Sequence, residues 1–500
     1  MKNYKTLFGS SIAVFLGLIV RIILVMLFEL LAARYLGPEE YGIYSFVFTI
    51  AIVLSALPTL GLVQSSRRFI ALYYNQQKQG YAKGVVRLCN AWSIGAGVFI
   101  VGLCFLFADM AREYLNADEK TLSLLLLMVF IVPFFAHRRL AISIFSGFKQ
   151  TANKVMLEDF AEPIVRILAV SALIFVGGTL TDFTLFTLVG YSLLGGLSVF
   201  LVWRTTVSAI AKDTNTSLEW KVFLGFSSTM VITELVELIL TWMDIIMLGM
   251  FSSDAQIGFF RSALQPAMLA SVILTSFSFI YMPLATEFYG EKKQDEWKDL
   301  NNLISIWSMS LAFPVSIVCI FYPGAVIEIL FGEQFLPAVE VLRVLAISYI
   351  FHSSCGFTGL NLIIGDKSKT QMVGKVLSLI LHAVLNMFLI PELGALGAAW
   401  AVLISVIFSN LYNLYWVNRY FSFHPFDKRY TGLLFLNLGI AFLSFVTLEA
   451  LSLPGFVCIL LMAGVHLPLL ALLSLKMGLV ERSSLLVFVD WVKQVRKSKS

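Results

Sequence analysis

Residues 8–34 read FGSSIAVFLGLIVRIILVMLFELLAAR, a long apolar run in which only Arg21, Glu29 and the final Arg34 are charged. A transmembrane helix needs about 20 mostly apolar residues to cross hydrocarbon about 30 Å thick. This run is long enough to span a bilayer, and it is too long for the apolar region of a cleaved signal peptide. The sequence therefore predicts a membrane helix that is retained at the start of the chain.

The same composition continues along the whole chain. Hydrophobic residues make up 59% and charged residues 13% of the 500 positions, against roughly 45–50% and 25% in an average soluble domain. This composition excludes a soluble domain and predicts an all-α polytopic membrane protein with about 14 transmembrane helices. The predicted spans are residues 8–34, 41–63, 84–108, 121–137, 156–177, 183–203, 221–250, 257–281, 301–323, 338–364, 371–391, 395–417, 430–450 and 452–475.

The basic residues predict the orientation of these spans. If the N-terminus is cytoplasmic, 29 of the 36 Lys and Arg residues fall on the inner side, including the stretch His137-Arg138-Arg139, which we interpret as a loop. Only Arg34, Arg112 and Lys120 fall outside. Because short cytoplasmic loops carry an excess of Lys and Arg, we predict a multi-pass protein of a prokaryotic cytoplasmic (inner) membrane with both termini in the cytoplasm.

Glycine-containing segments repeat along the chain. LGPEEYGIY (36–44) resembles FSSDAQIGF (251–259), and SGFK (146–149) resembles IGDK (364–367). Six predicted spans separate the partners, which indicates parallel repeats related by an axis along the membrane normal. The predicted organisation is an N-terminal six-helix lobe at 1–204, a cytoplasmic linker at 205–220, a C-terminal six-helix lobe at 221–420, two additional transmembrane helices at 421–476 and a basic amphipathic cytoplasmic tail at 477–500.

Three acidic residues share the seventh predicted span. Glu234, Glu237 and Asp244 are spaced by three and seven residues, which places them on one helical face. Each ionisable group costs roughly 2.5–3.5 kcal/mol at a helix centre in a bilayer, so it usually faces a cavity or a partner. We predict that the three acids line a water-filled cavity and couple transport to H+ or Na+. The alternative is that they are buried carboxylates paired with arginines or with backbone.

Two arginines lie within predicted spans, Arg21 in the first and Arg261 in the eighth. The planar guanidinium stays protonated and makes paired hydrogen bonds to anions, so both are candidates for binding an anionic headgroup. A salt bridge between lobes, for instance Arg21 with Glu237, is the alternative. In the fifth span, Glu162 and Arg166 are four residues apart and predict a local ion pair beside Pro163.

Motifs of soluble catalysis are not found. The sequence has no Walker A loop, no GxSxG motif and no His/Cys cluster with zinc-like spacing, and its five cysteines form no CxxC pair. We therefore predict a protein that is not an enzyme, with no cofactor, no metal site and no nucleic-acid partner. Energy for any transport would come from an ion gradient or from the substrate gradient itself.

Three segments resemble a known family. They are LAARYLGPEEYGIYS (31–45), LFGEQF (330–335) and LIPELGALGAAW (389–400). They are similar to loops of polysaccharide biosynthesis flippases of the Wzx type, in the multidrug/oligosaccharidyl-lipid/polysaccharide exporter superfamily. The resemblance covers about residues 5–420, and its glycine-centred patterns are more specific for the superfamily than for a substrate.

The resemblance implies two six-helix lobes around a central cavity, alternating access, and a polyprenyl-diphosphate-linked oligosaccharide as cargo. It also implies membrane lipids and glycosyltransferases or a polymerase as candidate partners. In the related lipid II flippases, arginines of the first and eighth helices serve the diphosphate, and Arg21 and Arg261 fall in the corresponding helices. The second span lacks the additional arginine of that group, which argues against a peptidoglycan precursor.

Two other functions fit the same sequence less well. A multidrug or cation antiporter of the superfamily would use the acidic residues of the seventh span to bind a cationic cargo directly. A non-transporting membrane subunit of a glycan assembly complex would belong to another class of protein. Polymerases of that class usually carry a long extracellular loop, whereas the predicted outer loops here are short.

Overall fold

The structure is a computed structural model that describes residues 2–210 and 216–477, with side chains from Gly17 onward. Every regular element in these ranges is helical. The described residues contain ten helices long and apolar enough to cross a membrane, or up to eleven if the bent pair Gly17–Thr59 and Leu62–Asn75 is one span. The prediction of an all-α polytopic membrane protein is confirmed, and the count of 14 spans stays a prediction.

The chain divides into two compact units between Gly258 and Phe259. We call Thr6–Gly258 the N-terminal unit and the part from Phe259 onward the C-terminal unit. The predicted lobes at 1–204 and 221–420 are defined by the sequence repeat, so their boundaries stay a prediction. Residues 211–215 of the predicted linker and 478–500 of the predicted tail lie outside the described residues.

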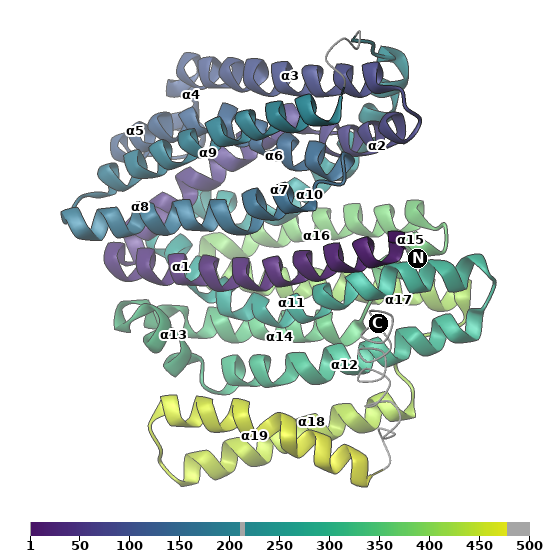
Figure 1. Cartoon of the computed structure of the whole chain (residues 1–500). Helices are drawn as coiled ribbons and strands as arrows, with labels where there is room; N and C mark the ends of the chain where they lie inside the picture. Colours follow the sequence, from purple (N-terminus) through teal and green to yellow (C-terminus); the bar gives the residue numbers. More distant parts are fainter. Residues whose placement is uncertain (1, 211–215, 478–500) are drawn as a thin grey trace. The chain divides into compact units, whose positions relative to one another are not determined.

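The helices of the N-terminal unit run side by side in Figure 1, coloured purple to teal. Their bounds are α1 Lys2–Ala56, η1 Leu57–Thr59, α2 Leu62–Asn75, α3 Gln79–Leu106, α4 Ala108–Tyr114, α5 Glu119–Met128, η2 Val129–Ile131, α6 Val132–Gly147, α7 Thr151–Val155, the π-helical turn η3 Met156–Ala161, α8 Glu162–Val176, α9 Leu180–Ala209 and α10 Trp220–Phe251. Helix α6 packs against α2, α3 and α9, and α10 packs against α2. The N-terminal unit is therefore assembled around α6.

The C-terminal unit is drawn in green to yellow in Figure 1. Its helices are α11 Asp254–Gly290, which begins in the N-terminal unit, α12 Gln294–Phe321, α13 Pro323–Phe331, η4 Glu333–Ala338, α14 Val339–Cys355, α15 Thr358–Ile364, α16 Ser368–Leu393, α17 Ala395–Phe421, α18 Lys428–Ala450 and α19 Gly455–Lys476. Helix α14 packs against α12 and α17, while the pair α18 and α19 packs against α12. This unit is therefore assembled around α12 and α14.

Helix α1 differs from the sequence prediction in one respect. A loop was expected near residues 35–40, but the helix continues through this segment and is interrupted only at Gly37, with φ 76° and ψ 173°. Glycine adopts positive φ without the steric penalty of a Cβ atom, and Pro38 then provides the fixed φ that suits the start of the next helix. The two residues produce a kink in place of a loop.

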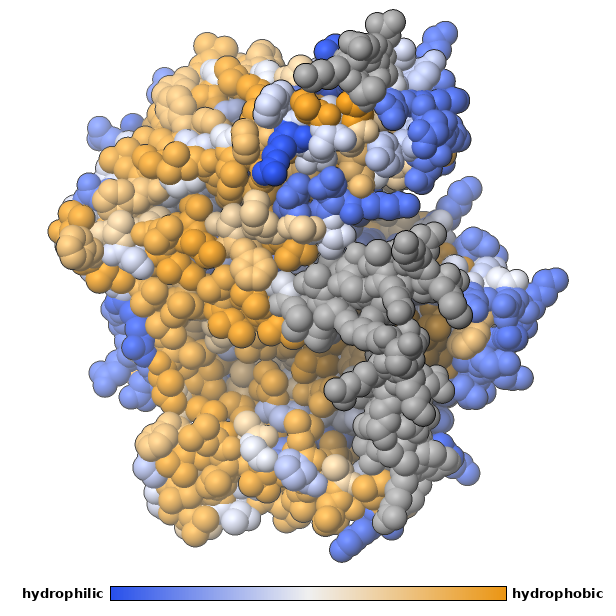
Figure 2. All heavy atoms as spheres, in the orientation of Figure 1, coloured by the Kyte–Doolittle hydropathy of each residue, from blue (hydrophilic) through white to orange (hydrophobic). Residues whose placement is uncertain are grey.

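The surface agrees with a membrane location. Hydrophobic residues cover much of the face shown in Figure 2, and hydrophilic residues gather mainly towards the ends of the helices. Many large apolar side chains are exposed in the described part of the chain, among them Phe175 at 92% and Phe435 at 72% of their full area. Such exposure would be unfavourable in water, whereas lipid tails solvate these side chains well.

Candidate functional site

Arg21 lies on α1 and faces the π-helical turn η3. Its Nη1 atom is 3.5 Å from Oε1 of Glu158, and the other carboxylate oxygen of Glu158 is 3.8 Å from Nζ of Lys154. The three side chains are 38%, 31% and 27% exposed. A carboxylate thus lies between two cations that remain open on one side.

The π-helical turn explains how this cluster is positioned. Asp159 follows Glu158, and its Oδ2 atom would lie 2.7 Å from a Cβ atom built on Gly17 of α1. Helix α1 can approach this closely only because residue 17 has no side chain. A π-helical turn changes the helical register locally, and such turns are frequent at functional sites. Here it presents two consecutive acidic residues towards the same neighbouring helix.

Two further ion pairs in the N-terminal unit are buried. Arg166 lies 3.4 Å from Glu29, and these side chains are 8% and 1% exposed. Arg138 lies 2.9 Å from Glu162, with 7% and 14% exposed. Glu162 and Arg166, predicted to form a local pair, each make their close ion pair with a residue on another helix, while their own charges attract each other at longer range. Spacing along one helix could not reveal these partners.

Aromatic residues surround the buried Arg166. Its guanidinium carbon lies 3.9 Å from the ring centre of Phe28 and 5.1 Å from that of Phe48. Tyr41 donates a hydrogen bond to the second carboxylate oxygen of Glu29. The positive charge is therefore compensated by the Glu29 carboxylate, by the more distant Glu162 and by the negative faces of two rings, which indicates a structural role.

The His137-Arg138-Arg139 stretch was expected to be a cytoplasmic loop, and that prediction is wrong. All three residues lie within α6, which continues to Gly147, and His137 and Arg138 are buried. His137 makes ring-nitrogen hydrogen bonds with Ser198 at 2.7 Å and with Asn90 at 3.1 Å. Because His137 and Arg138 have polar partners on neighbouring helices, they can be buried within a helix although their sequence indicates a loop.

Glu234 of α10 lies at the start of α2. Its Oε2 atom accepts a hydrogen bond of 3.1 Å from the backbone N–H of Gly61. The positive charges of Arg139 and Arg67 also act on this carboxylate. The first N–H groups of a helix lack partners within the helix and are satisfied by side-chain acceptors, so Glu234 joins α10 to the start of α2 through this hydrogen bond.

The other acids of α10 lie in different surroundings. Glu237 is exposed, whereas Asp244 is buried. The three acids therefore share one long helix and one broad face, with a different degree of burial at each position. The roles predicted for them in ion coupling stay a prediction.

Arg261 is half-buried on α11, within the C-terminal unit. Its predicted role in substrate binding also stays a prediction. Near the other end of that unit, the buried hydrogen bonds join uncharged groups. Asn361 donates to Asn301 at 2.8 Å, and Trp297 donates to Tyr281 at 3.0 Å.

The segment of α1 that follows the kink at Gly37 and the start of α11 bring the two copies of the repeated motif together. A Cβ atom on Gly42 would lie 1.8 Å from the carbonyl oxygen of Asp254, and one on Gly258 would lie 2.2 Å from that of Pro38. Pro38 and Asp254 are 216 residues apart, as are Gly42 and Gly258. The contact is reciprocal, as a two-fold relation between two copies requires.

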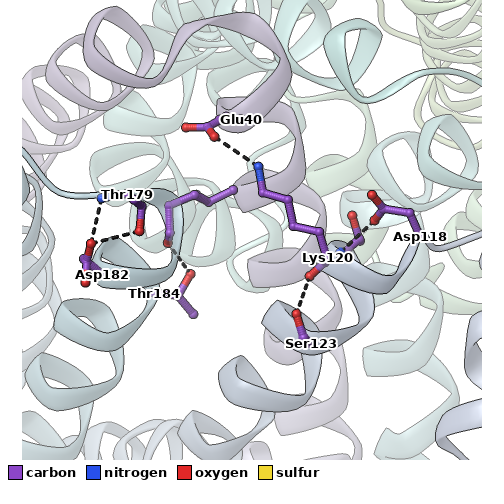
Figure 3. A network of polar contacts seen from close by, with 9 residues as sticks. Glu40, Asp118, Lys120, Ser123, Thr179, Asp182 and Thr184 are labelled. Atoms are coloured by element: carbon purple, nitrogen blue, oxygen red, sulfur yellow. Dashed lines mark hydrogen bonds and ion pairs between the residues drawn. The ribbon is translucent and has the colours of Figure 1, made fainter.

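Polar contacts hold the neighbouring helix ends in place (Figure 3). Lys120 donates a hydrogen bond of 3.1 Å to Glu40, and Asp118 accepts one of 2.7 Å from the backbone N–H of Thr121. Hydrogen bonds from the Thr121 hydroxyl and N–H hold the pKa of Asp118 below its usual value. Thr179 and Asp182 form a second cap of this kind at the start of α9.

The sequence analysis assigned no site role to several residues of the ion pairs and charge contacts described above. They are Glu29, Arg138, Arg139, Lys154 and Glu158. One signal was available, because Lys154 and Glu158 are four residues apart and acidic residues in spans were already conspicuous. Among the described residues, no three His, Cys, Asp or Glu side chains gather into a possible metal site.

The fold is similar to that of solved membrane transporters. The structure is similar to lipid II flippase MurJ in its inward closed conformation, with a TM-score of 0.69 at 15% identity over 95% of this chain and 100% of that one. It is also similar to an inward-facing multidrug resistance MATE family transporter, with a TM-score of 0.65 at 15% identity over 81% and 98% of the two chains. At these identities the likeness establishes the fold alone.

Sequence comparison identifies the family. Residues 8–289 match the model of the family described as polysaccharide biosynthesis protein, so the chain belongs to this family. The chain is 22% identical over 397 residues to a putative O-antigen transporter of Shigella flexneri, covering 76% of this chain and 90% of that protein. It is 22% identical over 232 residues to the probable low-salt glycan biosynthesis flippase Agl15 of Haloferax volcanii, covering 46% of this chain and 49% of that relative. The predicted resemblance is confirmed, and the chain is a multi-span membrane transporter of the flippase type.

Proposed function

We propose that this protein moves a polyprenyl-diphosphate-linked oligosaccharide from the cytoplasmic to the outer leaflet by alternating access. Family membership supports a glycan substrate, and the half-exposed Arg21 is the structural observation that carries the proposal. A cation within a predicted membrane span and open on one side suits the diphosphate that joins lipid to sugar. The lipid tail would remain in the bilayer while the headgroup crosses.

The remaining parts of the mechanism belong to the same proposal. Arg261 serves as the second arginine for the diphosphate, and Glu234, Glu237 and Asp244 couple the movement of two six-helix lobes to an H+ or Na+ gradient. The exposed Glu237 and the helix-capping Glu234 support this role, since both are carboxylates at predicted membrane depth. We place the protein in a prokaryotic cytoplasmic membrane with both termini in the cytoplasm.

Complementation tests the substrate class. In a host whose own flippase gene is deleted and whose glycan this protein exports, Arg21→Gln should lower surface glycan by about tenfold or more, because a charge-assisted contact to the diphosphate is lost. Arg343→Gln is the matched control, since Arg343 pairs locally with Glu340. Equal export by Arg21→Gln and wild type, at equal protein level, would contradict the role of Arg21.

A multidrug or cation antiporter is the second candidate, favoured by the exposed Glu237 on α10. In proteoliposomes with an imposed pH gradient, an antiporter would move a fluorescent lipophilic cation, and Glu237→Gln would stop that movement. The proposed flippase would instead leave the cation gradient unchanged. Cation transport without any effect on surface glycan would replace our proposal with this alternative.

A further inference from the structure

The interior charges of the N-terminal unit fall into two kinds. The pairs Arg166–Glu29 and Arg138–Glu162 are buried, with every side chain 14% exposed or less. Arg21, Glu158 and Lys154 are each 27–38% exposed. A buried ion pair cannot exchange its partner without exposing an uncompensated charge in a low dielectric. Of these two kinds, only the partly exposed cluster of Arg21, Glu158 and Lys154 can exchange a counter-ion at a low cost in free energy.

The contacts within this group are loose. The N···O distances of 3.5 Å and 3.8 Å exceed the roughly 2.7–2.9 Å of well-formed charge-assisted hydrogen bonds. Glu158 therefore compensates the charge of Arg21 and Lys154 without using their N–H groups in close hydrogen bonds. Those donors stay available to an anion that brings more oxygen atoms and more negative charge than one carboxylate.

The local backbone supports a function for this arrangement. Lys154 is on α7 and Glu158 is in the π-helical turn η3, so the two are joined through a segment whose register is irregular. Asn153 fixes α7 through a hydrogen bond of 3.2 Å to Thr205 of α9. The Lys154 backbone is thus held in place, while its long side chain can still change partner.

We propose that Arg21 and Lys154 form a two-cation site for a diphosphate group, in which Glu158 is a resident counter-ion that the diphosphate displaces. The inference rests on the proposed function for the nature of the anion, and it adds Lys154 and Glu158 to the site. A diphosphate carries oxygens on two phosphorus atoms, so one cation can serve each phosphate. Asp159, against Gly17, stays in place and limits how tightly the anion is held, which favours later release.

Binding measurements on purified full-length protein test this site. The probes are farnesyl diphosphate, inorganic pyrophosphate and the uncharged farnesol, titrated in one detergent by calorimetry. Glu158→Gln should bind the diphosphates about tenfold more tightly, because the competing carboxylate is neutralised in a partly exposed site. Lys154→Gln and Arg21→Gln should each bind about tenfold more weakly, and Lys154→Arg should restore affinity.

Matched controls come from another exposed ion pair. Glu291 and Lys293 lie 2.6 Å apart and are 49% and 50% exposed, outside the proposed site. Glu291→Gln and Lys293→Gln should therefore bind as wild type does. If the variants change the affinity for pyrophosphate as much as the affinity for farnesyl diphosphate, the site recognises the free anion alone. If only the affinity for farnesyl diphosphate changes, the site recognises a lipid headgroup. The affinity for the uncharged farnesol should be the same in wild type and in every site variant.

The outcomes separate this inference from the proposed function. Unchanged or weaker diphosphate binding by Glu158→Gln, or no binding by wild type and Glu158→Gln, would overturn the two-cation site. Surface glycan that depends on the protein would then still support the proposed function. Conversely, the variants could change diphosphate affinity as expected while the protein exports no glycan. That result would support the two-cation site and overturn the proposed cargo.

Discussion

At the scale of single residues, the role of a carboxylate–arginine ion pair depends on how deeply its two side chains are buried. Glu29 is 1% exposed and compensates Arg166 among aromatic rings, whereas Glu158 is 31% exposed between two cations. The sequence shows both as acidic residues within predicted spans, and the local difference is Lys154, four residues before Glu158. The arginine that pairs with each carboxylate is 137 positions away in the chain, so only the packing of α1 against the α7–α8 segment reveals these two pairs.

Removing one partner of the buried pair should destabilise the protein strongly. Glu29→Gln leaves Arg166 without its counter-ion and should cost about 3–5 kcal/mol of unfolding free energy. Thermal unfolding in detergent, followed by size-exclusion chromatography, would show the loss as a lower midpoint temperature. Glu40→Gln removes a carboxylate from an exposed pair with Lys120 and should cost less than about 1 kcal/mol. Equal midpoints for both variants would contradict the structural role of Glu29.

At the scale of elements, apolar length predicted most helices, and contacts between helices decided the rest. Apolar runs placed α3, α9 and α16 well, since each is long and mostly uncharged. The run ending near residue 137 stopped too early, because His137 and Arg138 are polar but have partners on neighbouring helices. The π-helical turn at Met156–Ala161 has no sequence signal of its own, so the site built on it could not be predicted.

The close contact between the two copies of the repeated motif can be tested by adding one methyl group at Gly258. Gly258→Ala should destabilise the protein by about 1–3 kcal/mol, because its Cβ atom would lie 2.2 Å from the backbone oxygen of Pro38 and the backbone must shift. Gly95→Ala on α3 is the control, since nothing lies within 4 Å of its Cβ position. Thermal unfolding of both variants measures the difference. An unchanged midpoint for Gly258→Ala would show that this contact adapts freely.

At the scale of the whole molecule, charge is unevenly distributed between the units. The buried ion pairs described here lie in the N-terminal unit, while the buried network of Tyr281, Asn301 and Asn361 in the C-terminal unit is uncharged. Composition predicted a membrane protein with charges in its interior, but it could not predict that these buried pairs would lie in one unit. The asymmetry supports a main anion-binding role for the N-terminal unit.

The predicted topology can be checked by labelling of introduced cysteines. Glu113→Cys should react with a membrane-impermeant maleimide in intact cells, because α4 is predicted to lie outside. Lys298→Cys should react only after permeabilisation, since the start of α12 is predicted to be cytoplasmic. The background should be low once Cys104 is replaced by Ser, because the other four cysteines are buried. Labelling of Lys298→Cys in intact cells would reverse the proposed orientation.

The buried pairs also bear on how the protein would respond to membrane voltage. An elementary charge that crosses the full field of a 100 mV potential changes energy by about 2.3 kcal/mol. Arg166 with Glu29, and Arg138 with Glu162, each sum to zero charge, so a shift of either pair along the membrane normal without rotation transfers no net charge through the field. Any electrical current that accompanies turnover would then arise from the cargo, from a coupling ion, or from groups that change partner during the cycle.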